Sequence, residues 1–157
     1  MQDDEVLARA GASAARRVIG VAILTALGGL LLYVALTSVA VIGWQVFLVI
    51  CGALALWAGQ VMWRATSLAL VLTREELRDS EGTLLARMSD ITHVDRGAFA
   101  FKPSNGFMIK TESQQPRGWR PGIWWRLGRR VAIGGVIPSA EAKFMADMIL
   151  AMKAGRV

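Results

Sequence analysis

The sequence predicts an α+β membrane protein, in which a hairpin of two apolar helices precedes an antiparallel β domain that ends in a helix. Three observations predict this class. No charged side chain occurs between Val18 and Trp63. Short apolar segments separated by turn-forming residues fill most of the chain after Ser67, a pattern typical of antiparallel strands. Beyond Pro138 the apolar residues recur at helical spacing.

The composition agrees with a chain that is partly embedded in lipid. Of its 157 residues, 54% are hydrophobic, and the net charge is +6. The mean hydropathy is +0.43 and the isoelectric point is about 10.4. Soluble domains rarely reach this hydrophobic fraction, and the excess lies before Arg64.

The charge-free stretch is too long for one membrane helix. At ~1.5 Å rise per residue, a single helix over it would be about twice as long as the ~30 Å hydrocarbon core of a bilayer. Two spans with a turn near Thr37–Gln45, where polar and flexible residues gather, fit the length. The expected parts are a tail over 1–17, a transmembrane hairpin over 18–64 (spans about 18–38 and 45–63) and a soluble domain over 65–157.

Arginines at both ends of the hairpin predict its orientation. Those before the first span are Arg9, Arg16 and Arg17, those after the second are Arg64, Arg74 and Arg78, and the connecting turn carries no charge. By the positive-inside rule, both termini then face the cytoplasm. The alternative is a cleaved signal peptide, since Ser38-Val39-Ala40 resembles a cleavage site. However, the apolar stretch before it is longer than the ~7–15 residues of a typical signal.

The N-terminal tail is expected to form a surface helix that continues into the first span. Leu7, Ala8, Ala12 and Ala15 suggest this by their helical spacing.

Small residues in the two spans would allow helices to pack closely. Spacing of about four positions puts them on one helix face, where they let two backbones approach. They are Ala22, Ala26, Gly28 and Gly29 in the first span and Gly52, Ala55 and Gly59 in the second. They either seal the hairpin against itself or dock on helices of a larger membrane complex. The spans hold no ionisable Asp, Glu, Lys, Arg or His, which argues against a transporter or pump.

The soluble part predicts six or seven short strands. Turn signals at Asp79–Gly82 and at Asn105-Gly106 separate them. The expected strands are Ser67–Thr73, Leu77–Asp79, Thr83–Met88, Ile91–Asp95, Phe99–Lys102, Phe107–Lys110 and Arg130–Ile133.

The C-terminal helix is expected to begin at Pro138-Ser139, with Ser139 as its N-cap and Glu141 near the positive end of the helix dipole. One face is rich in apolar residues, namely Phe144, Met145, Met148, Ile149 and Met152. We expect this face to pack on the domain's own sheet; a groove for a partner is the alternative.

These segments together resemble a family of small bacterial membrane proteins, in which a two-helix hairpin precedes a pleckstrin-homology-like (PH-like) domain. The residues that carry the resemblance are Val71–Arg78, Glu81-Gly82, Ser89–Val94, Arg129–Gly135 and the helix after Pro138. The resemblance covers about Val18 to Ala154. It implies a bent, seven-stranded antiparallel sheet, a β-barrel or sandwich, closed by a helix. It also implies that the protein is anchored in the bacterial inner membrane. It also implies binding or assembly rather than catalysis, since relatives of this type include assembly factors for electron-transfer or photosynthetic complexes.

The segment from Pro116 to Arg126 departs from that family because it is rich in Trp, Arg and Pro, which leaves a strand there in doubt. The overlapping segment Arg117–Arg130 contains five arginines and three tryptophans, and no acid occurs between Glu112 and Glu141. The candidate binding residues are Arg117, Trp119, Arg120, Trp124, Trp125, Arg126, Arg129 and Arg130. Three interpretations stay open: contact with anionic phospholipid headgroups, contact with a protein partner, or packing in the domain's own core.

No catalytic or metal-binding pattern stands out. The chain has one His, His93, and one Cys, Cys51, which lies inside the second span, whereas a zinc site needs three or four ligands. We therefore expect no enzyme activity, no metal and no cofactor. The basic charge invites nucleic acid as a partner, but membrane tethering explains the charge and no nucleic-acid-binding motif is present.

The sequence thus predicts a non-catalytic accessory or assembly subunit of an inner-membrane complex, with an integral-membrane complex and anionic phospholipids as partners. The alternative is a stand-alone module that binds anionic lipid or recruits proteins.

Overall fold

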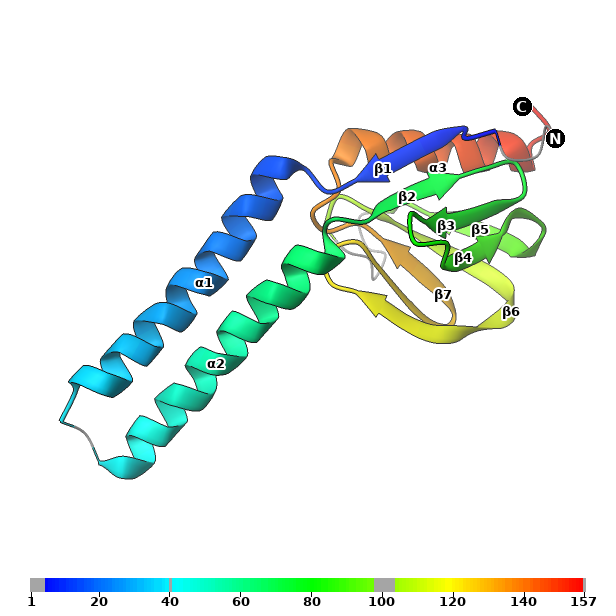
Figure 1. Ribbon diagram of the computed structural model, residues 1–157. Coiled ribbons are helices and arrows are strands. Elements are labelled where there is room, and N and C mark those ends of the chain that lie inside the picture. The colour runs from blue at the N-terminus through cyan, green and yellow to red at the C-terminus, as the bar shows by residue number, and fades with distance from the viewer. Residues whose placement is uncertain (1–4, 40, 98–103, 157) are drawn as a thin grey trace. The chain divides into compact units, whose positions relative to one another are not determined.

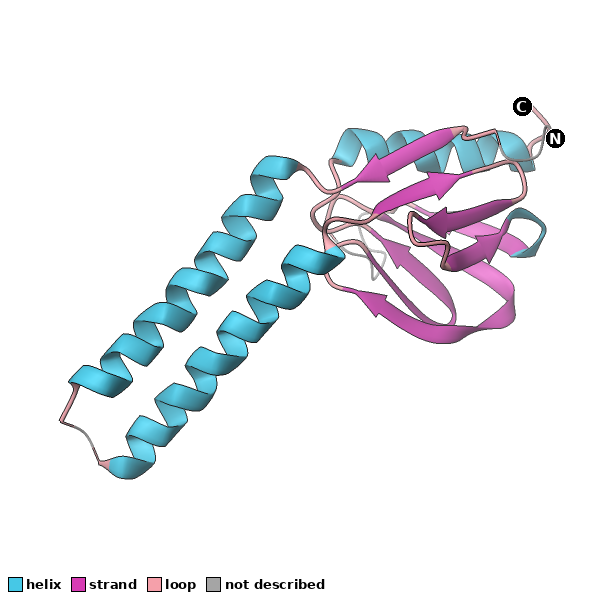
Figure 2. Cartoon of the chain, viewed as in Figure 1, coloured by secondary structure: helices cyan, strands magenta, loops and turns pink. Residues whose placement is uncertain are grey.

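The computed structural model describes residues 5–39, 41–97 and 104–156. The chain divides into two compact units (Figures 1 and 2). Residues Ala14–Arg64 form a helical unit, and the segment up to Ser13 joins the chain from Ala65 onward in a β unit. The predicted α+β class, with two long apolar helices, antiparallel strands and a C-terminal helix, is confirmed.

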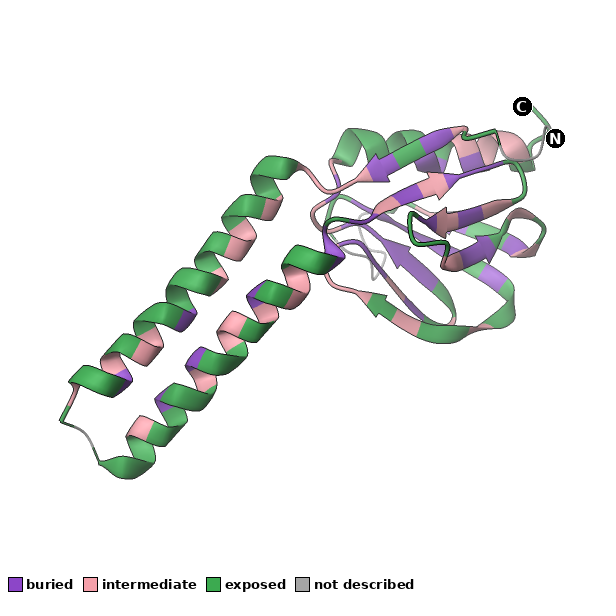
Figure 3. Cartoon of the chain, in the orientation of Figure 1, coloured by how far each residue is buried: buried purple, intermediate pink, exposed green. Residues whose placement is uncertain are grey.

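The helical unit consists of α1 (Ala14–Thr37) and α2 (Ile42–Ala65), each long and apolar enough to cross a membrane. Only 11% and 17% of their most apolar windows are buried, far less than in the core helix of a soluble protein, and Figure 3 shows both helices mostly exposed. The predicted turn is present but shorter than expected, because Gly43 to Gln45 already belong to α2. Gln45 Nε2 donates a hydrogen bond to the Ser38 carbonyl oxygen across this turn (3.1 Å).

Part of the N-terminal tail forms a strand, so the surface helix predicted there is wrong; among its described residues the tail is helical only from Ala14 onward, as the start of α1. Strand β1 (Ala8–Gly11) pairs antiparallel with β2 (Ala69–Leu72), with Ala8 opposite Leu72 and Gly11 opposite Ala69. Ala8 and Ala10 are buried while Arg9 between them is exposed, which is the alternation of a half-buried strand. The physical reason is tertiary: small alanines fit helix or strand, and the partner β2 decides between them.

Two antiparallel sheets make up the β unit. The first has the order β1-β2-β3-β4, with β3 at Glu76–Asp79 and β4 at Leu84–Arg87. A 3-10 turn, η1 (Met88–Asp90), leads to the second sheet, whose order is β5-β6-β7. Its strands are β5 (Ile91–Asp95), β6 (Phe107–Arg120) and β7 (Trp124–Ile133). Among the described residues the two sheets are separate and do not close into a barrel, which was one of the two predicted arrangements.

Most predicted strands are confirmed to within two residues at each end, and two are longer than expected. The segments Phe107–Lys110 and Arg130–Ile133 are only parts of β6 and β7. The strand expected at Phe99–Lys102 lies outside the described residues.

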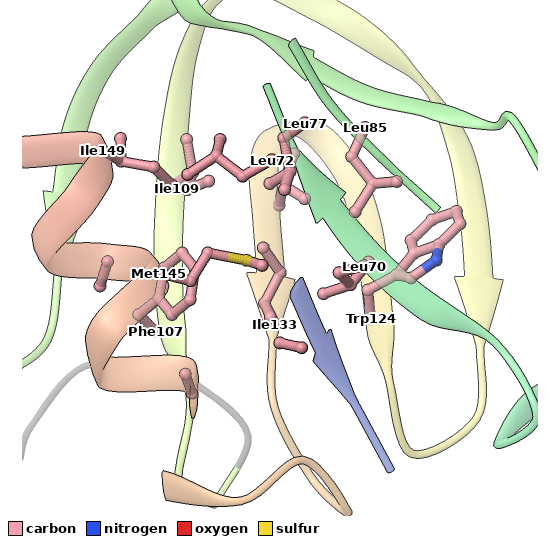
Figure 4. Close-up of a cluster of buried hydrophobic side chains, with 14 of the residues drawn as sticks. Leu70, Leu72, Leu77, Leu85, Phe107, Ile109, Trp124, Ile133, Met145 and Ile149 are labelled. Carbon is pink, nitrogen blue, oxygen red and sulfur yellow. The ribbon is translucent and has the colours of Figure 1, made fainter. Parts of the chain in front are cut away.

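Helix α3 (Ser139–Lys153) covers the core with its Met-rich face. Met145 and Ile149 are fully buried, and Figure 4 shows Met145 beside Phe107 and Ile133. The expected core role of this helix is therefore confirmed, except that Phe144 is 54% exposed. Ser139 is the first helical residue rather than the N-cap, and the cap position, Pro138, makes no side-chain capping bond.

Candidate functional site

The Arg/Trp segment is a β-hairpin made by the end of β6 and the start of β7. Gly118 pairs with Arg126, Trp119 with Trp125 and Arg120 with Trp124. Directly paired residues of an antiparallel ladder share a face, and successive residues alternate between faces. The pairing therefore sorts the predicted binding residues onto two faces of the hairpin.

The inner face belongs to the domain core. Trp124 is only 4% exposed, and a Cβ built on Gly118 would lie 2.8 Å from Trp124 Cη2. The indole therefore lies against the backbone at Gly118, where any larger residue would collide with it. Of the three interpretations left open for the Arg/Trp segment, packing in the domain's own core is therefore the one that holds for Trp124.

Arg126 on the same face connects the two sheets. Its side chain is buried; Nε donates to the Pro116 carbonyl oxygen and Nη1 to the Leu84 carbonyl oxygen, at 2.5 Å each. The guanidinium lies 5.5 Å from the centroid of the Trp124 ring. Because Leu84 belongs to β4 and Pro116 to β6, this arginine holds the first sheet against the second and leaves little of its side chain for a ligand.

Burial lowers the pKa of the Arg126 guanidinium, and the negative charge of Asp79 opposes that effect. Asp79 is 1% exposed. Its Oδ1 accepts hydrogen bonds from the Glu81 and Thr83 amides, at 3.0 and 2.8 Å, while Oδ2 is buried without a partner among the described residues. An arginine stays protonated in proteins, so the buried pair of opposite charges is a structural feature of this end of the core.

The outer face is apolar, with an arginine beside it. Trp119 is 64% exposed and Leu127 is 51% exposed, while Trp125 is half-buried and Arg117 is exposed. Alternation puts Trp119, Trp125 and Leu127 on one face, with the two tryptophans directly opposite each other. Arg117 precedes Trp119 in β6, at the register shift between Gln115 and Gly118. We call these four residues the Trp119 face. Leu127 was not among the predicted residues; the two-residue spacing from Trp125 would have found it once the strand was recognised.

The remaining three predicted arginines are not members of the Trp119 face. Arg129 and Arg130 are exposed farther along β7, and Arg130 lies opposite Lys110. Arg120 is on the inner side at the strand end, where it forms an ion pair with Glu81 (3.2 Å). Among the described residues, the side chains of Arg117, Arg129 and Arg130 make no hydrogen bond or ion pair.

The glycines predicted for helix packing bring α1 and α2 together. A Cβ on Gly28 would lie 2.9 Å from the Gly52 carbonyl oxygen, and a Cβ on Gly59 would lie 3.5 Å from Leu24 Cβ. Gly20, which was not among the predicted residues, joins this contact: a Cβ there would lie 2.7 Å from Met62 Cε. Its spacing of about two helical turns from Gly28 was the signal that could have found it.

The other small residues do not join that contact. Ala22, Ala26 and Gly29 are exposed, and a Cβ on Gly29 would meet nothing within 4 Å. Ala55 is half-buried. The predicted set thus divides into residues that pack α1 on α2 and a small-residue face of α1 that stays open.

An arginine–tryptophan contact that the sequence analysis missed joins the ends of the two helices. Arg17 Nη2 donates to the Trp63 carbonyl oxygen (3.1 Å), and its guanidinium lies 3.9 Å from the centroid of the Trp63 ring. Stacking of a guanidinium on an indole is favourable. The two residues at the borders of the charge-free stretch therefore fasten α1 to α2.

The polar clusters elsewhere are structural. Asp90 accepts hydrogen bonds from the Ser113 amide, Ser113 Oγ and Gln115 Nε2, and these bonds lower the pKa of Asp90. His93 is exposed on β5, and Cys51 lies half-buried in α2. Within the described ranges, no three His, Cys, Asp or Glu side chains gather as metal ligands would.

Comparison with protein-family models, with curated proteins and with solved structures gave no match in any of the three.

Proposed function

We propose that the protein is a non-catalytic accessory or assembly subunit of an inner-membrane complex. It is anchored by the α1–α2 hairpin and carries a cytoplasmic PH-like β domain. Two sheets of four and three antiparallel strands, followed by a helix over their core, support the PH-like assignment.

The pairing of β1 with β2 supports a hairpin with both ends on one side of the membrane. Residues 8–11 and 69–72 lie on either side of the two apolar helices in sequence, yet they form one ladder. Two strands can pair only in the same compartment, and two crossings return the chain to its starting side. Signal cleavage after α1 would remove β1 from the domain; Ala40 of the possible cleavage site lies outside the described residues. The flanking arginines favour the cytoplasmic side.

The open small-residue face of α1 is the observation that carries the assignment to a complex. Ala22, Ala26 and Gly29 fall at the i, i+4 and i+7 positions of one helix face, and α2 does not use them. Small residues permit close approach of another helix in a membrane, where packing rather than water exclusion drives association. A helix of a partner protein is the occupant that this face fits.

A second candidate function is a stand-alone module that binds anionic lipid or recruits proteins. The exposed Trp119 and the exposed arginines Arg117, Arg129 and Arg130 favour it.

A mild-detergent pull-down of the tagged protein, read by mass spectrometry, tests the proposal. We expect a fixed-ratio set of integral-membrane proteins that is lost from Ala26→Leu/Gly29→Leu. The matched control is Ala53→Leu, which enlarges an exposed small residue of α2 and should keep the partners. Recovery of the protein with lipid alone would contradict the subunit assignment and favour the second candidate.

A further inference from the structure

We infer that the Trp119 face lies in the headgroup layer of an anionic bilayer, with Trp119, Trp125 and Leu127 at the boundary to the acyl chains. Arg117, Arg129 and Arg130 then meet lipid phosphates. This inference rests on the membrane anchoring proposed above, but it requires no partner complex.

The turn between β6 and β7 lies at the end of the β unit from which the chain continues into the apolar helices. The turn at Pro121–Ile123 lies against the two segments that lead to the apolar helices. The Gly122 carbonyl oxygen accepts a bond from the Val136 amide (2.9 Å), and the Val136 carbonyl oxygen accepts one from the Ser13 amide (3.1 Å). A Cβ on Gly122 would also lie 3.4 Å from Thr66 Cγ2.

Chain connectivity then places this turn near the membrane. Ser13 directly precedes the first residue of α1, and Thr66 directly follows the last residue of α2. Each residue of linker spans at most ~3.6 Å. Whatever angle the two units adopt, the tip of the β6–β7 hairpin therefore stays within a few residues' reach of the points where the chain enters the apolar segments.

The side chains next to this tip suit the headgroup layer. Tryptophan is enriched at membrane–water interfaces because its ring is amphipathic, and Trp119 is 64% exposed beside the cross-strand Trp125. Leu127 extends the apolar surface along β7. These three side chains would expose an apolar patch to water, whereas in the headgroup layer lipid would cover that patch.

The charges on and around the face select anionic lipid. Arg117, Arg129 and Arg130 are exposed, and their side chains have no hydrogen-bonding or ionic partner among the described residues. No acid occurs from Ser113 to Ala140. The guanidinium fork matches phosphate oxygens in geometry as well as charge. Because the anchor already confines the domain, the contact is effectively intramolecular and needs no tight binding from solution.

Fluorescence quenching in vesicles tests this placement with the full chain. In a Cys51→Ala background, Leu127→Cys carries an environment-sensitive fluorophore, which leaves both tryptophans in place. Ser89→Cys, exposed in η1 outside the Trp119 face, carries the control probe. The vesicles contain phosphatidylcholine with or without phosphatidylglycerol, and a spin label near the headgroup is the quencher.

We expect several-fold stronger quenching at position 127 than at position 89, and more with phosphatidylglycerol than without it. Arg117→Gln/Arg129→Gln should reduce the quenching at position 127. Arg87→Gln/Arg156→Gln, which removes the same charge from exposed positions elsewhere, should not. Equal quenching at both probe positions in the anionic vesicles would overturn the inference.

Alkaline extraction of the same vesicles distinguishes failure of the lipid contact from failure of the membrane anchoring. Retention of the chain with unquenched Leu127→Cys refutes only the placement of the Trp119 face. Release of the chain by alkali refutes the membrane anchoring, and with it both proposals. An isolated but quenched chain refutes the complex and leaves the lipid contact standing.

Discussion

Truncation of Trp124 and of Trp119 should have very different effects on stability, although both residues belong to one β-hairpin. Trp124 is 4% exposed and lies against Gly118, whereas Trp119 is 64% exposed on the opposite face. We predict that Trp124→Ala strongly lowers the free energy of unfolding of the β unit and that Trp119→Ala lowers it much less.

The magnitudes follow from the area that each ring removes from water. A fully buried aromatic side chain covers ~150–250 Å², which at ~25 cal/mol/Å² corresponds to about 4–6 kcal/mol. Core Trp→Ala substitutions cost about 3–5 kcal/mol. For Trp119, about a third of that area is covered, so its loss corresponds to roughly 1–2 kcal/mol as an upper bound. Trp124→Ala should therefore cost two to three times as much as Trp119→Ala.

Pulse proteolysis of the full chain in detergent, over a urea series, measures this difference. The protease cuts the unfolded β unit while the detergent protects the apolar helices. Equal losses from the two variants, or a larger loss from Trp119→Ala, would show that the two faces of the hairpin are assigned the wrong way round.

Three further predictions concern the helices, the acid response and the N-terminal strand. Leu24→Cys/Gly59→Cys in a Cys51→Ala background should form a disulfide readily, since the two Cβ positions lie 3.5 Å apart. Adding Gly28→Ile should lower the disulfide yield and adding Gly29→Ile should not; a lower yield with Gly29→Ile than with Gly28→Ile would contradict the observed packing of α1 on α2. Because hydrogen bonds lower the folded-state pKa of Asp90 below the ordinary value of 3.8, the contribution of Asp90 to stability is complete above that value and is lost as the pH falls through the lowered pKa. Between neutral pH and pH ~3, the urea midpoint of Asp90→Asn should therefore fall less than that of the unsubstituted chain; an equal fall in both would contradict this contribution. A chain that begins at Ala65 should unfold at lower urea than one in which residues 5–13 are fused by a short Gly-Ser linker to Thr66, because β1 covers β2; equal midpoints would mean that β1 adds nothing.

The helical hairpin and the C-terminal helix could be predicted because their signals are local. Charge-free spans with arginines at their borders need no tertiary information, and the apolar face that buries Met145 and Ile149 repeats at helical spacing. The turn before β6 was equally local: Asn105 has φ +60°, a conformation that asparagine tolerates better than most residues.

The strand β1 and the full length of β6 could not be predicted in the same way. The sequence of β1 fits a helix as well as a strand, and its partner β2 lies beyond two helices. In β6, Pro116 argues against a strand, yet it falls where the pairing with β7 shifts register. A bulge tolerates a residue without an amide proton.

The division of the Arg/Trp residues depended on the same tertiary information. Nothing local distinguishes Trp124 from Trp119 as the buried residue. The register with β7 and the absence of a side chain at Gly118 decide it. The sequence could therefore identify the segment as unusual but could not say which of its side chains are free to bind.

The ladder between β1 and β2 makes the folding of the β unit depend on the preceding steps of biosynthesis. The N-terminal strand leaves the ribosome first but has no partner until Ala69–Leu72 has been made, after both apolar helices. In the membrane arrangement proposed above, a chain whose second helix failed to insert would leave the two strands in different compartments, with β2 uncovered along one edge. Such an open edge is a site for aggregation and a target for proteolysis. Completion of the β unit would thus report that the membrane topology is correct, and misinserted chains would be the ones presented to quality control.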